Sequence, residues 1–153
     1  MKIMFVCLGN ICRSPMAEFV FNYEAKNRGV LEKYEVASAG TCEEEEGSHV
    51  HYGTVAELKR RGVPFRERRA VLLRAADYDR YDLFIGMDES NVRCMKRLFN
   101  GDPYNKVKLL NYYTGNPRDV ADPWYTGNFV KTYDDIRTGI ECLLDNLEQE
   151  VNV

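Results

Sequence analysis

Residues 2–20 read KIMFVCLGNICRSPMAEFV, and they join a strand-like run to a helix-like run through a short polar turn. The apolar run Lys2–Cys7 is rich in strand-forming residues. From Ser14 onward, apolar residues recur at helical spacing until Gly29, which favours a helix stop. The thiol of Cys7 stands at the entrance of the turn and the guanidinium of Arg13 at its exit. A strand followed at once by a helix is the repeating unit of α/β proteins.

The rest of the chain continues this alternation of strand and helix patterns. The predicted strands are Lys2–Cys7, Tyr34–Ala39, Leu83–Met87 and Val107–Leu110, and the predicted helices are Ser14–Arg28, His51–Arg61, Glu89–Phe99 and Val130–Glu150. The alternation predicts a mostly parallel sheet with helices on both faces. Ligands of such sheets bind beyond the carboxyl ends of the strands, where Cys7 lies.

Length and composition limit the functional classes. The 153 residues predict one domain over residues 1–153, and 44% hydrophobic with 29% charged residues is typical of a globular protein. The net charge of -3 gives no reason to expect a nucleic-acid partner. No apolar run reaches membrane-spanning length, and the run after Lys2 is too short for a secretory signal. We therefore expect a cytoplasmic protein with no membrane partner.

The cysteines and histidines argue against a disulfide framework and a metal site. The five cysteines form an odd number and include no C-x-x-C pair. The two histidines, His49 and His51, lie in a stretch typical of a solvated helix start. No Cys/His cluster has the spacing of zinc ligands. We expect neither a metal nor a cofactor.

The turn has the composition of an oxyanion cradle. Gly9 and Asn10 tolerate positive φ, so the backbone amides of the turn can converge on one point. Ser14 is a candidate helix cap and Pro15 the candidate first helical residue. The helix N-terminus adds partial positive charge, and the planar fork of Arg13 can hold two phosphate oxygens.

The same surroundings favour the thiolate form of Cys7, which is the nucleophilic form. The Ser14 hydroxyl can donate a hydrogen bond to the sulfur and favour the thiolate further. The alternative is that Cys7 is a buried core residue, because buried cysteines are common. The Cys-x5-Arg spacing alone would favour that alternative, and the added Gly9, Asn10, Ser14 and Pro15 reverse the judgement. The nucleotide-hydrolase P-loop is excluded because no Gly-Lys-Ser/Thr follows the turn.

The run VCLGNICRSPMAE resembles the phosphate-binding loop of the low-molecular-weight protein-tyrosine phosphatases. The resemblance covers essentially the whole chain and continues in the family's order through Ser38–Thr41, Tyr81–Leu83, Met87–Asn91 and Asp122–Tyr125. It implies a three-layer α/β/α fold around a four-stranded parallel sheet in the flavodoxin-like order 2-1-3-4. It also implies hydrolysis of phosphotyrosine in proteins or peptides through a phosphocysteine on Cys7. In that reading, the phosphate is bound by Leu8, Gly9, Asn10, Ile11, Cys12, Arg13 and Ser14.

Departure of the leaving oxygen needs a proton, and Asp122 is the best candidate to supply it. Asp122 precedes a proline, which restricts its backbone. It lies in the aromatic, non-periodic stretch 111–128, and long irregular loops are usually functional. The family's Asp-Pro motif implies the role of general acid and then general base for Asp122. We place Asp122 ahead of Asp119, where family members often carry a second acid.

Three apolar or aromatic residues favour an aryl phosphate as the substrate. Trp124 and Tyr125 form a candidate stacking wall, which 112–113 could support from behind. Ile11 offers an apolar contact, whereas a related branch that dephosphorylates arginine carries threonine at this place. Protein-arginine phosphatase therefore remains an alternative. Thiol-dependent arsenate reductase is another, although it needs downstream cysteines and only Cys94 is near. A phosphotyrosine-binding module would need neither Cys7 nor Asp122.

The resemblance assigns supporting roles to further residues. Cys12 matches a family cysteine that pairs reversibly with the nucleophile, which implies a redox switch. The hydrogen bonds that brace the loop are assigned to Asn10, Ser14, Ser38 and Asn91. A histidine that many relatives add to this network is missing here, and Arg68 or Arg69 is the candidate substitute. The acidic run Glu43–Glu46 either forms a solvated loop or borders the cleft and favours basic phosphopeptides. The physiological substrate, the kinase and the oligomeric state stay open.

Overall fold

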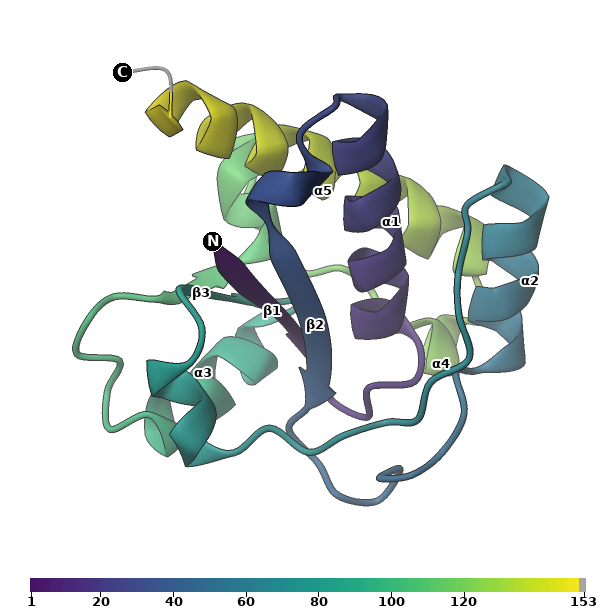
Figure 1. Cartoon of the computed structure of the whole chain (residues 1–153). Helices are drawn as coiled ribbons and strands as arrows, with labels where there is room; N and C mark the ends of the chain where they lie inside the picture. Colours follow the sequence, from purple (N-terminus) through teal and green to yellow (C-terminus); the bar gives the residue numbers. More distant parts are fainter. Residues whose placement is uncertain (152–153) are drawn as a thin grey trace.

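A parallel sheet of four strands forms the centre of the computed structural model, which describes residues 1–151 (Figure 1). The strands are β1 (Lys2–Cys7), β2 (Glu35–Gly40), β3 (Leu83–Gly86) and β4 (Val107–Leu109). Their order is β2-β1-β3-β4, with all neighbouring pairs parallel. The predicted strand order 2-1-3-4 is confirmed. Residues 152 and 153 of the predicted domain lie outside the described residues.

Strand β1 is buried on both faces, as expected for the centre of a parallel sheet. Ile3, Phe5 and Cys7 point into one hydrophobic cluster, while Met4 and Val6 point into a second. This alternation follows from the two-residue period of a strand. Both clusters are fully apolar at β1, so the sheet is held firmly just before the turn that begins at Cys7.

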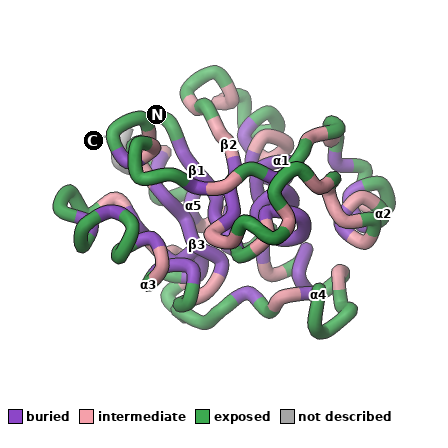
Figure 2. The backbone as a smooth tube through the Cα atoms, turned by 90° about the horizontal axis from the view of Figure 1, so that it is seen from below, coloured by how far each residue is buried: buried purple, intermediate pink, exposed green. Residues whose placement is uncertain are grey.

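Helices cover the two faces unequally. The first cluster packs under α1 (Arg13–Asn27), α2 (Tyr52–Arg61) and α5 (Phe129–Val151), and the second packs under α3 (Glu89–Leu98). This is the predicted three-layer α/β/α arrangement. In Figure 2, which looks at the molecule from below, the central strands are buried, whereas the short helix α4 (Pro123–Thr126) lies at the exposed rim.

Several element boundaries differ from the prediction. Helix α1 begins at Arg13, and Cys12 occupies the N-cap position without a side-chain cap. Ser14 is therefore not the cap, and Pro15 is not the first helical residue. The stretch 111–128 was expected to be irregular, but it contains α4 and part of a 3-10 helix, η3 (Leu110–Thr114). Two further 3-10 helices, η1 (Leu31–Lys33) and η2 (Ala75–Asp79), precede β2 and β3.

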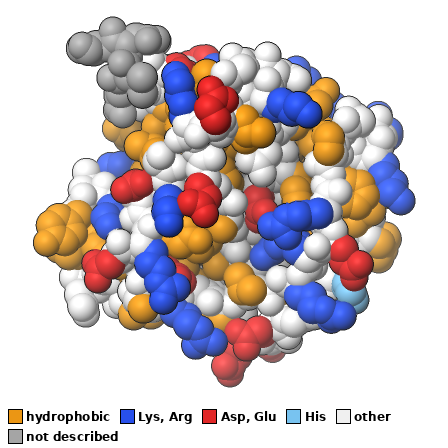
Figure 3. Space-filling view, viewed as in Figure 1, with side chains coloured by type: hydrophobic (Ala, Val, Ile, Leu, Met, Phe, Trp, Pro, Cys, Tyr) orange, Lys and Arg blue, Asp and Glu red, His pale blue; other side chains and the backbone are white. Residues whose placement is uncertain are grey.

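The surface seen in Figure 3 carries both signs of charge. Lys and Arg side chains alternate with Asp and Glu over this face, and acidic side chains gather at its lower edge. Figure 1 places the loop between β2 and α2 at that edge. Of the helices described, none combines the length and the apolar character needed to cross a bilayer.

Candidate active site

The turn between β1 and α1 wraps around the Cys7 sulfur. Asn10 adopts a left-handed conformation with φ of 57°, and Gly9 does not need one. The Asn10 backbone N–H points at the Cys7 Sγ at 3.3 Å, and the Ser14 Oγ lies 3.0 Å from the same sulfur. Donors that face a sulfur stabilise its thiolate. Cys7 itself is only 3% exposed, so the protein shields most of its side chain from solvent.

Strand β2 supports the turn from outside. A Cβ atom on Gly40 would lie 2.9 Å from the Leu8 carbonyl oxygen and 3.1 Å from the Gly9 carbonyl carbon. Only glycine allows this close approach of two backbones. The backbone N–H groups of Thr41 and Cys42 then donate to the carbonyls of Cys7 and Leu8. The Ser38–Thr41 segment therefore fixes the first half of the turn.

Arg13 is held below the turn by three acceptors. Its Nη1 donates to Asp88 Oδ2 and to the Val120 carbonyl, each at 2.8 Å, and its Nη2 donates to Asp122 Oδ2 at 3.4 Å. Burial alone would lower the pKa of Arg13, but the charges of Cys7, Asp88 and Asp122 raise it. The side chain is 2% exposed, and its Nε has no hydrogen-bond partner among the described residues. A buried, permanently charged donor without a partner fits an oxyanion.

Asp122 stands at the N-cap of α4, with Pro123 as the first helical residue. Its Oδ1 accepts from the Trp124 backbone N–H at 3.0 Å, and its Oδ2 is the oxygen that faces Arg13. The carboxylate thus keeps a fixed orientation while its side chain remains 21% exposed. A fixed and partly exposed carboxyl group is suited to proton transfer.

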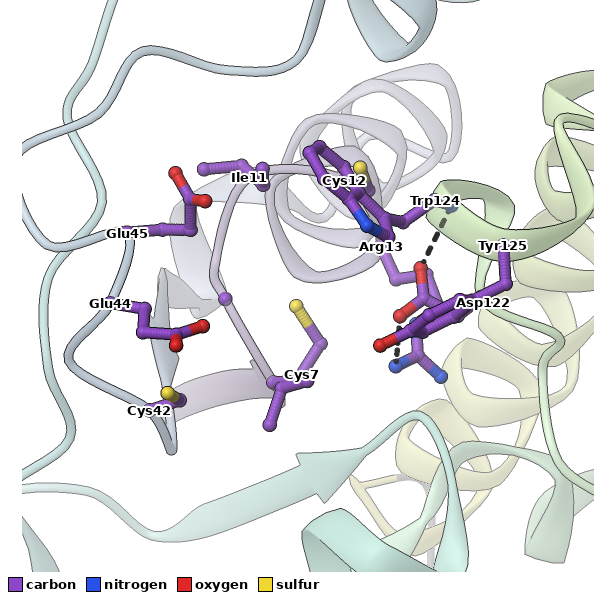
Figure 4. A pocket seen from close by; sticks show the side chains of 12 residues that line it. Cys7, Ile11, Cys12, Arg13, Cys42, Glu44, Glu45, Asp122, Trp124 and Tyr125 are labelled. Atoms are coloured by element: carbon purple, nitrogen blue, oxygen red, sulfur yellow. Dashed lines mark hydrogen bonds and ion pairs between the residues drawn. The ribbon is translucent and has the colours of Figure 1, made fainter.

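A single pocket brings these groups together (Figure 4). The Cys7 sulfur lies between two walls, with Trp124 and Tyr125 on the side of Asp122 and with Glu44 and Glu45 on the opposite side. The residues that line the pocket are Cys7, Leu8, Gly9, Ile11, Cys12, Arg13, Cys42, Glu44, Glu45, Asp122, Trp124 and Tyr125. In residues 1–151, no group of three His, Cys, Asp or Glu side chains is placed to hold a metal ion.

Asn10 is the centre of the hydrogen bonds that brace the turn. Its Nδ2 donates to Ser14 Oγ at 2.8 Å and to Ser38 Oγ at 3.0 Å. Its Oδ1 accepts from Arg68 Nη2 at 2.8 Å and from the Val71 N–H at 3.0 Å. One side chain thus ties the turn to α1, to β2 and to the segment before η2.

Arg68, not Arg69, completes this network. The Arg68 side chain is 8% exposed, and its Nη2 also lies 3.3 Å from the Ser38 carbonyl. Arg69 instead donates to the Gly47 carbonyl at an exposed position. Burial lowers the pKa of Arg68 below its ordinary value, and the nearby charges of Glu18 and Cys7 only partly oppose this shift. The buried Glu18 accepts a hydrogen bond from Ser38 at 2.7 Å.

Comparison with known proteins identifies the family. The model of the low molecular weight phosphotyrosine protein phosphatases matches residues 2–153. The chain belongs to this family. The low molecular weight protein-tyrosine-phosphatase YfkJ of Bacillus subtilis is 38% identical over 97% of both chains. The corresponding enzyme PtpA of Staphylococcus aureus is 35% identical over 99% of this chain and 96% of its own.

Solved structures agree with this assignment. The crystal structure of Bacillus subtilis YfkJ superimposes with a TM-score of 0.94 at 37% identity, covering 98% of this chain and 96% of that one. A Drosophila arginine phosphatase has the same fold, with a TM-score of 0.88 at 27% identity, covering 96% of this chain and 98% of that one. The fold is therefore shared by relatives named for two different substrates.

The structure separates the predicted site residues into those that meet and those that do not. Cys7, Arg13, Asp122, Ile11, Trp124 and Tyr125 share the pocket, as do Leu8, Gly9 and Cys12. Asn91 does not contact the turn directly. Its Oδ1 accepts from the backbone N–H groups of Met87 and Asp88. The rings of 112–113 contact each other and do not line the pocket. Asp119 accepts from the Glu89 N–H at the start of α3.

Three residues in or beside the pocket had no role predicted from the sequence. Asp88 holds Arg13, and its place at the N-cap of α3, two residues after β3, was the available signal. Cys42 lines the pocket because it follows β2, the neighbour of β1. His51 contacts the Trp124 ring. The two residues lie more than 70 positions apart in the chain, so no local sequence pattern predicts this contact.

Proposed function

We propose that this chain hydrolyses phosphotyrosine monoesters in proteins or peptides through a phosphocysteine on Cys7, with Arg13 binding the phosphate and Asp122 acting as general acid and base. The observation that carries the proposal is the shared pocket, which Cys7, Arg13 and Asp122 line together. The buried Arg13 Nε has no hydrogen-bond partner among the described residues. Family membership supports it, because the family is described by this activity.

In the first step, the Cys7 thiolate attacks phosphorus, so that an S–P bond forms as the P–O bond to the phenol breaks. Asp122 gives its proton to the departing oxygen. Arg13 and the amides of Leu8–Ser14 hold the three non-bridging oxygens, whose charge they stabilise in the transition state. The Arg13 side chain needs no rearrangement, because Asp88 and the Val120 carbonyl already fix it.

In the second step, the Asp122 carboxylate takes a proton from water, and the water oxygen attacks phosphorus. The S–P bond breaks, inorganic phosphate leaves, and Cys7 returns as the thiolate. The Ser14 Oγ, 3.0 Å from the sulfur, stabilises this leaving thiolate. No electron acceptor or metal takes part in either step, and the protonation state of Asp122 is restored.

The pocket walls support an aryl phosphate over phosphoarginine. Trp124 and Tyr125 are 56% and 77% exposed and stand beside Asp122, so their faces are available to a phenol ring. Ile11 lines the pocket beside Glu45 (Figure 4), and its apolar side chain offers no hydrogen-bond partner to a guanidinium. Cys94 lies in α3 and does not line this pocket, which disfavours arsenate reduction through a resolving cysteine there.

The acidic wall supports a preference for basic phosphopeptides. Glu44 and Glu45 line the pocket, whereas Glu43 and Glu46 do not. Glu45 is fixed by the Ser48 hydroxyl, which donates to its Oε2 at 3.0 Å. A cationic residue next to the phosphotyrosine would meet this carboxylate at the pocket mouth.

The proposal includes a redox role for Cys12, which would pair reversibly with Cys7. It lines the same pocket as Cys7 and is 4% exposed. Burial and the neighbouring charges of Cys7 and Asp122 raise the pKa of Cys12 to about 12. Cys12 is therefore a thiol at neutral pH and does not compete with Cys7 as a nucleophile.

A comparison of phosphopeptides tests the proposed function. We expect kcat/KM for a phosphotyrosine peptide to exceed that for the matched phosphoarginine peptide, with no effect of a chelator. Basic flanking residues should raise kcat/KM about two- to fivefold over acidic ones, the range of an exposed ion pair. Substitution of Glu44 and Glu45 by Gln should remove that preference. Faster release of phosphate from phosphoarginine would contradict the proposed substrate.

A further inference from the structure

His51 lies where the phosphate loop, helix α5 and the segment that carries Asp122 meet. Its backbone N–H donates to the Ile11 carbonyl at 2.8 Å. Its ring stacks on Phe129, with centroids 5.2 Å apart and an interplanar angle of 18°. The same ring meets Trp124 edge to face, with centroids 5.6 Å apart and an angle of 79°. His51 therefore contacts both the phosphate loop and the Trp124 wall from outside the pocket.

The His51 ring is held in place by its neighbours. Its Nδ1 accepts from the Gly53 N–H at 3.0 Å and so caps helix α2. The Phe129 ring lies against Gly53 so closely that a Cβ there would be 2.4 Å from it. Phe129 in turn packs against the cluster that contains Ile11 and Cys12. A ring held by a hydrogen bond at Nδ1 and by stacking on Phe129 can act as a rigid support.

Trp124 depends on this support. It is 56% exposed, and within residues 1–151 the one aromatic ring it contacts is that of His51. The Trp124 backbone N–H is also the donor that orients Asp122 Oδ1. Helix α4 has only four residues, so it cannot hold its own position through internal hydrogen bonds. A contact at Trp124 is thus transmitted directly to Asp122.

We propose that His51 is a positioning residue for the reaction: its ring docks Trp124 and thereby holds the Asp122 carboxyl group over the phosphate loop. The inference rests on the proposed function, because Asp122 is the proton donor there. His51 touches neither the substrate nor the reacting atoms. It acts through Trp124, and the residue that caps α2 is at the same time the residue that aligns the acid.

Two substitutions separate the cap from the ring. His51→Asn keeps a side-chain acceptor, since asparagine is a favourable N-cap, but it removes the ring from Trp124. His51→Phe keeps a ring and removes the acceptor from Gly53. We expect His51→Asn to have a near-wild-type Tm with impaired positioning. We expect His51→Phe to have a Tm lower by about 2–4 °C with positioning retained.

Fluorescence measures the docking without reference to activity. Trp124 is the single tryptophan of the chain, so its emission reports one site. His51→Asn should increase quenching by acrylamide and shift the emission to longer wavelength, whereas His51→Phe should leave both near wild type. The matched control is His49→Asn, because His49 pairs with Glu67 at 3.1 Å and makes no ring contact with Trp124. Unchanged quenching in His51→Asn would overturn the inference.

Kinetics tests whether docking reaches Asp122. Loss of an aligned acid should lower kcat/KM about tenfold for phosphotyrosine, and less for para-nitrophenyl phosphate, whose leaving phenol is more acidic. In the Asp122→Ala background, His51→Asn should add less than about twofold, because both changes remove the same proton transfer. A full additional loss would show that His51 acts elsewhere and would overturn the inference.

The fluorescence and kinetic experiments also distinguish failure of the His51 role from failure of the proposed function. If Asp122→Ala keeps wild-type kcat/KM, the proposed acid is wrong, and the fluorescence still decides whether His51 docks Trp124. If His51→Asn frees Trp124 but keeps wild-type kcat/KM while Asp122→Ala is impaired, the proposed function stands and the positioning role of His51 fails.

Discussion

At the scale of single residues, Asn10 and Arg68 show how the turn around the Cys7 sulfur, the proposed nucleophile, is kept in place. Asn10 takes a left-handed backbone that few residue types accept, and its side chain ties the turn to three other segments. Arg68 fixes the acceptor end of that side chain at 2.8 Å. A buried guanidinium in this position stays charged at every physiological pH, so the support of the turn does not titrate.

Arg68→Gln should lower kcat/KM about tenfold, because Asn10 Oδ1 loses a charged donor and the turn loosens around the sulfur. Steady-state kinetics with para-nitrophenyl phosphate measures the loss. Arg69→Gln is the matched control, since Arg69 contacts only the exposed Gly47 carbonyl among its hydrogen bonds. Equal effects of the two substitutions would show that the Arg68 contact is unimportant.

The Cys12 thiol predicts a pH-dependent rate of protective oxidation. Peroxide converts the Cys7 thiolate to a sulfenic acid, and the Cys12 thiolate then displaces hydroxide to form the disulfide. Burial raises the pKa of Cys12 well above neutrality, so its thiolate fraction rises with pH between pH 6 and 9. Disulfide formation after a short peroxide pulse, followed by mass spectrometry, should accelerate accordingly between pH 6 and 9. A rate independent of pH, or disulfide in Cys12→Ser, would contradict this assignment.

The meeting of Cys7, Arg13 and Asp122 in one pocket could be predicted from their types and spacing, because they carry the groups that the proposed two-step phosphoryl transfer requires. The residues that hold them were harder to predict. Asp88 and His51 act through contacts between segments distant in the chain, and only the folded structure shows those contacts.

At the scale of elements, the end of β2 and the turn after β1 form one unit. Strand β2 ends at Gly40, where its backbone passes under Leu8 and Gly9 without room for a side chain. The sequence pattern predicted the strand as Tyr34–Ala39, within one residue of Glu35–Gly40 at each end. The pattern also placed the start of α1 within one residue, but its candidate cap was wrong, because the Ser14 hydroxyl contacts the Cys7 sulfur and Asn10 instead.

Gly40→Ala should displace the turn and lower kcat/KM about ten- to a hundredfold, since its Cβ would lie 2.9 Å from a backbone oxygen that cannot rotate away. Gly139→Ala is the control for steric strain alone. Its Cβ would lie 2.6 Å from the Leu110 Cγ, inside the packing of α5 on η3 and outside the pocket. We expect the control to lower the Tm with kcat/KM preserved. Wild-type kcat/KM in Gly40→Ala would contradict the supporting role of β2.

At the scale of the whole molecule, the parallel sheet gathers the carboxyl ends of β1, β2 and β3 at one edge, and the pocket lies there. This placement could be predicted from the alternation of strands and helices, and the strand order from the family resemblance.

A buried carboxylate away from the pocket also contributes to the stability of the fold. Asp102, 8% exposed, accepts from Tyr78 Oη at 2.6 Å and from the backbone N–H groups of Lys106 and Val107 at the start of β4.

Asp102 predicts how stability depends on pH. Burial alone would raise the pKa of Asp102, but hydrogen bonds from Tyr78, Val107 and Lys106 lower it below the ordinary 3.8. The folded state therefore binds this proton less tightly than the unfolded state. The stabilisation is fully present above the ordinary pKa and is lost as the pH falls through the folded-state pKa.

Asp102→Asn should lower the free energy of unfolding by about 1–3 kcal/mol at pH 7, and the difference from wild type should shrink below about pH 4. Asparagine tolerates the positive φ of 61° at this position, so backbone strain does not enter the comparison. Urea unfolding at several pH values measures the difference. A constant difference from pH 7 to pH 3 would contradict the role given to the Asp102 carboxylate.

Trapping the covalent intermediate tests the central claim most directly. Wild-type enzyme is mixed with a phosphotyrosine peptide, quenched in acid within milliseconds, digested and sequenced by mass spectrometry. We predict phosphate on Cys7, no phosphate on the protein in Cys7→Ser, and no turnover by that variant. Phosphate on another residue, or turnover by a correctly folded Cys7→Ser, would contradict the account.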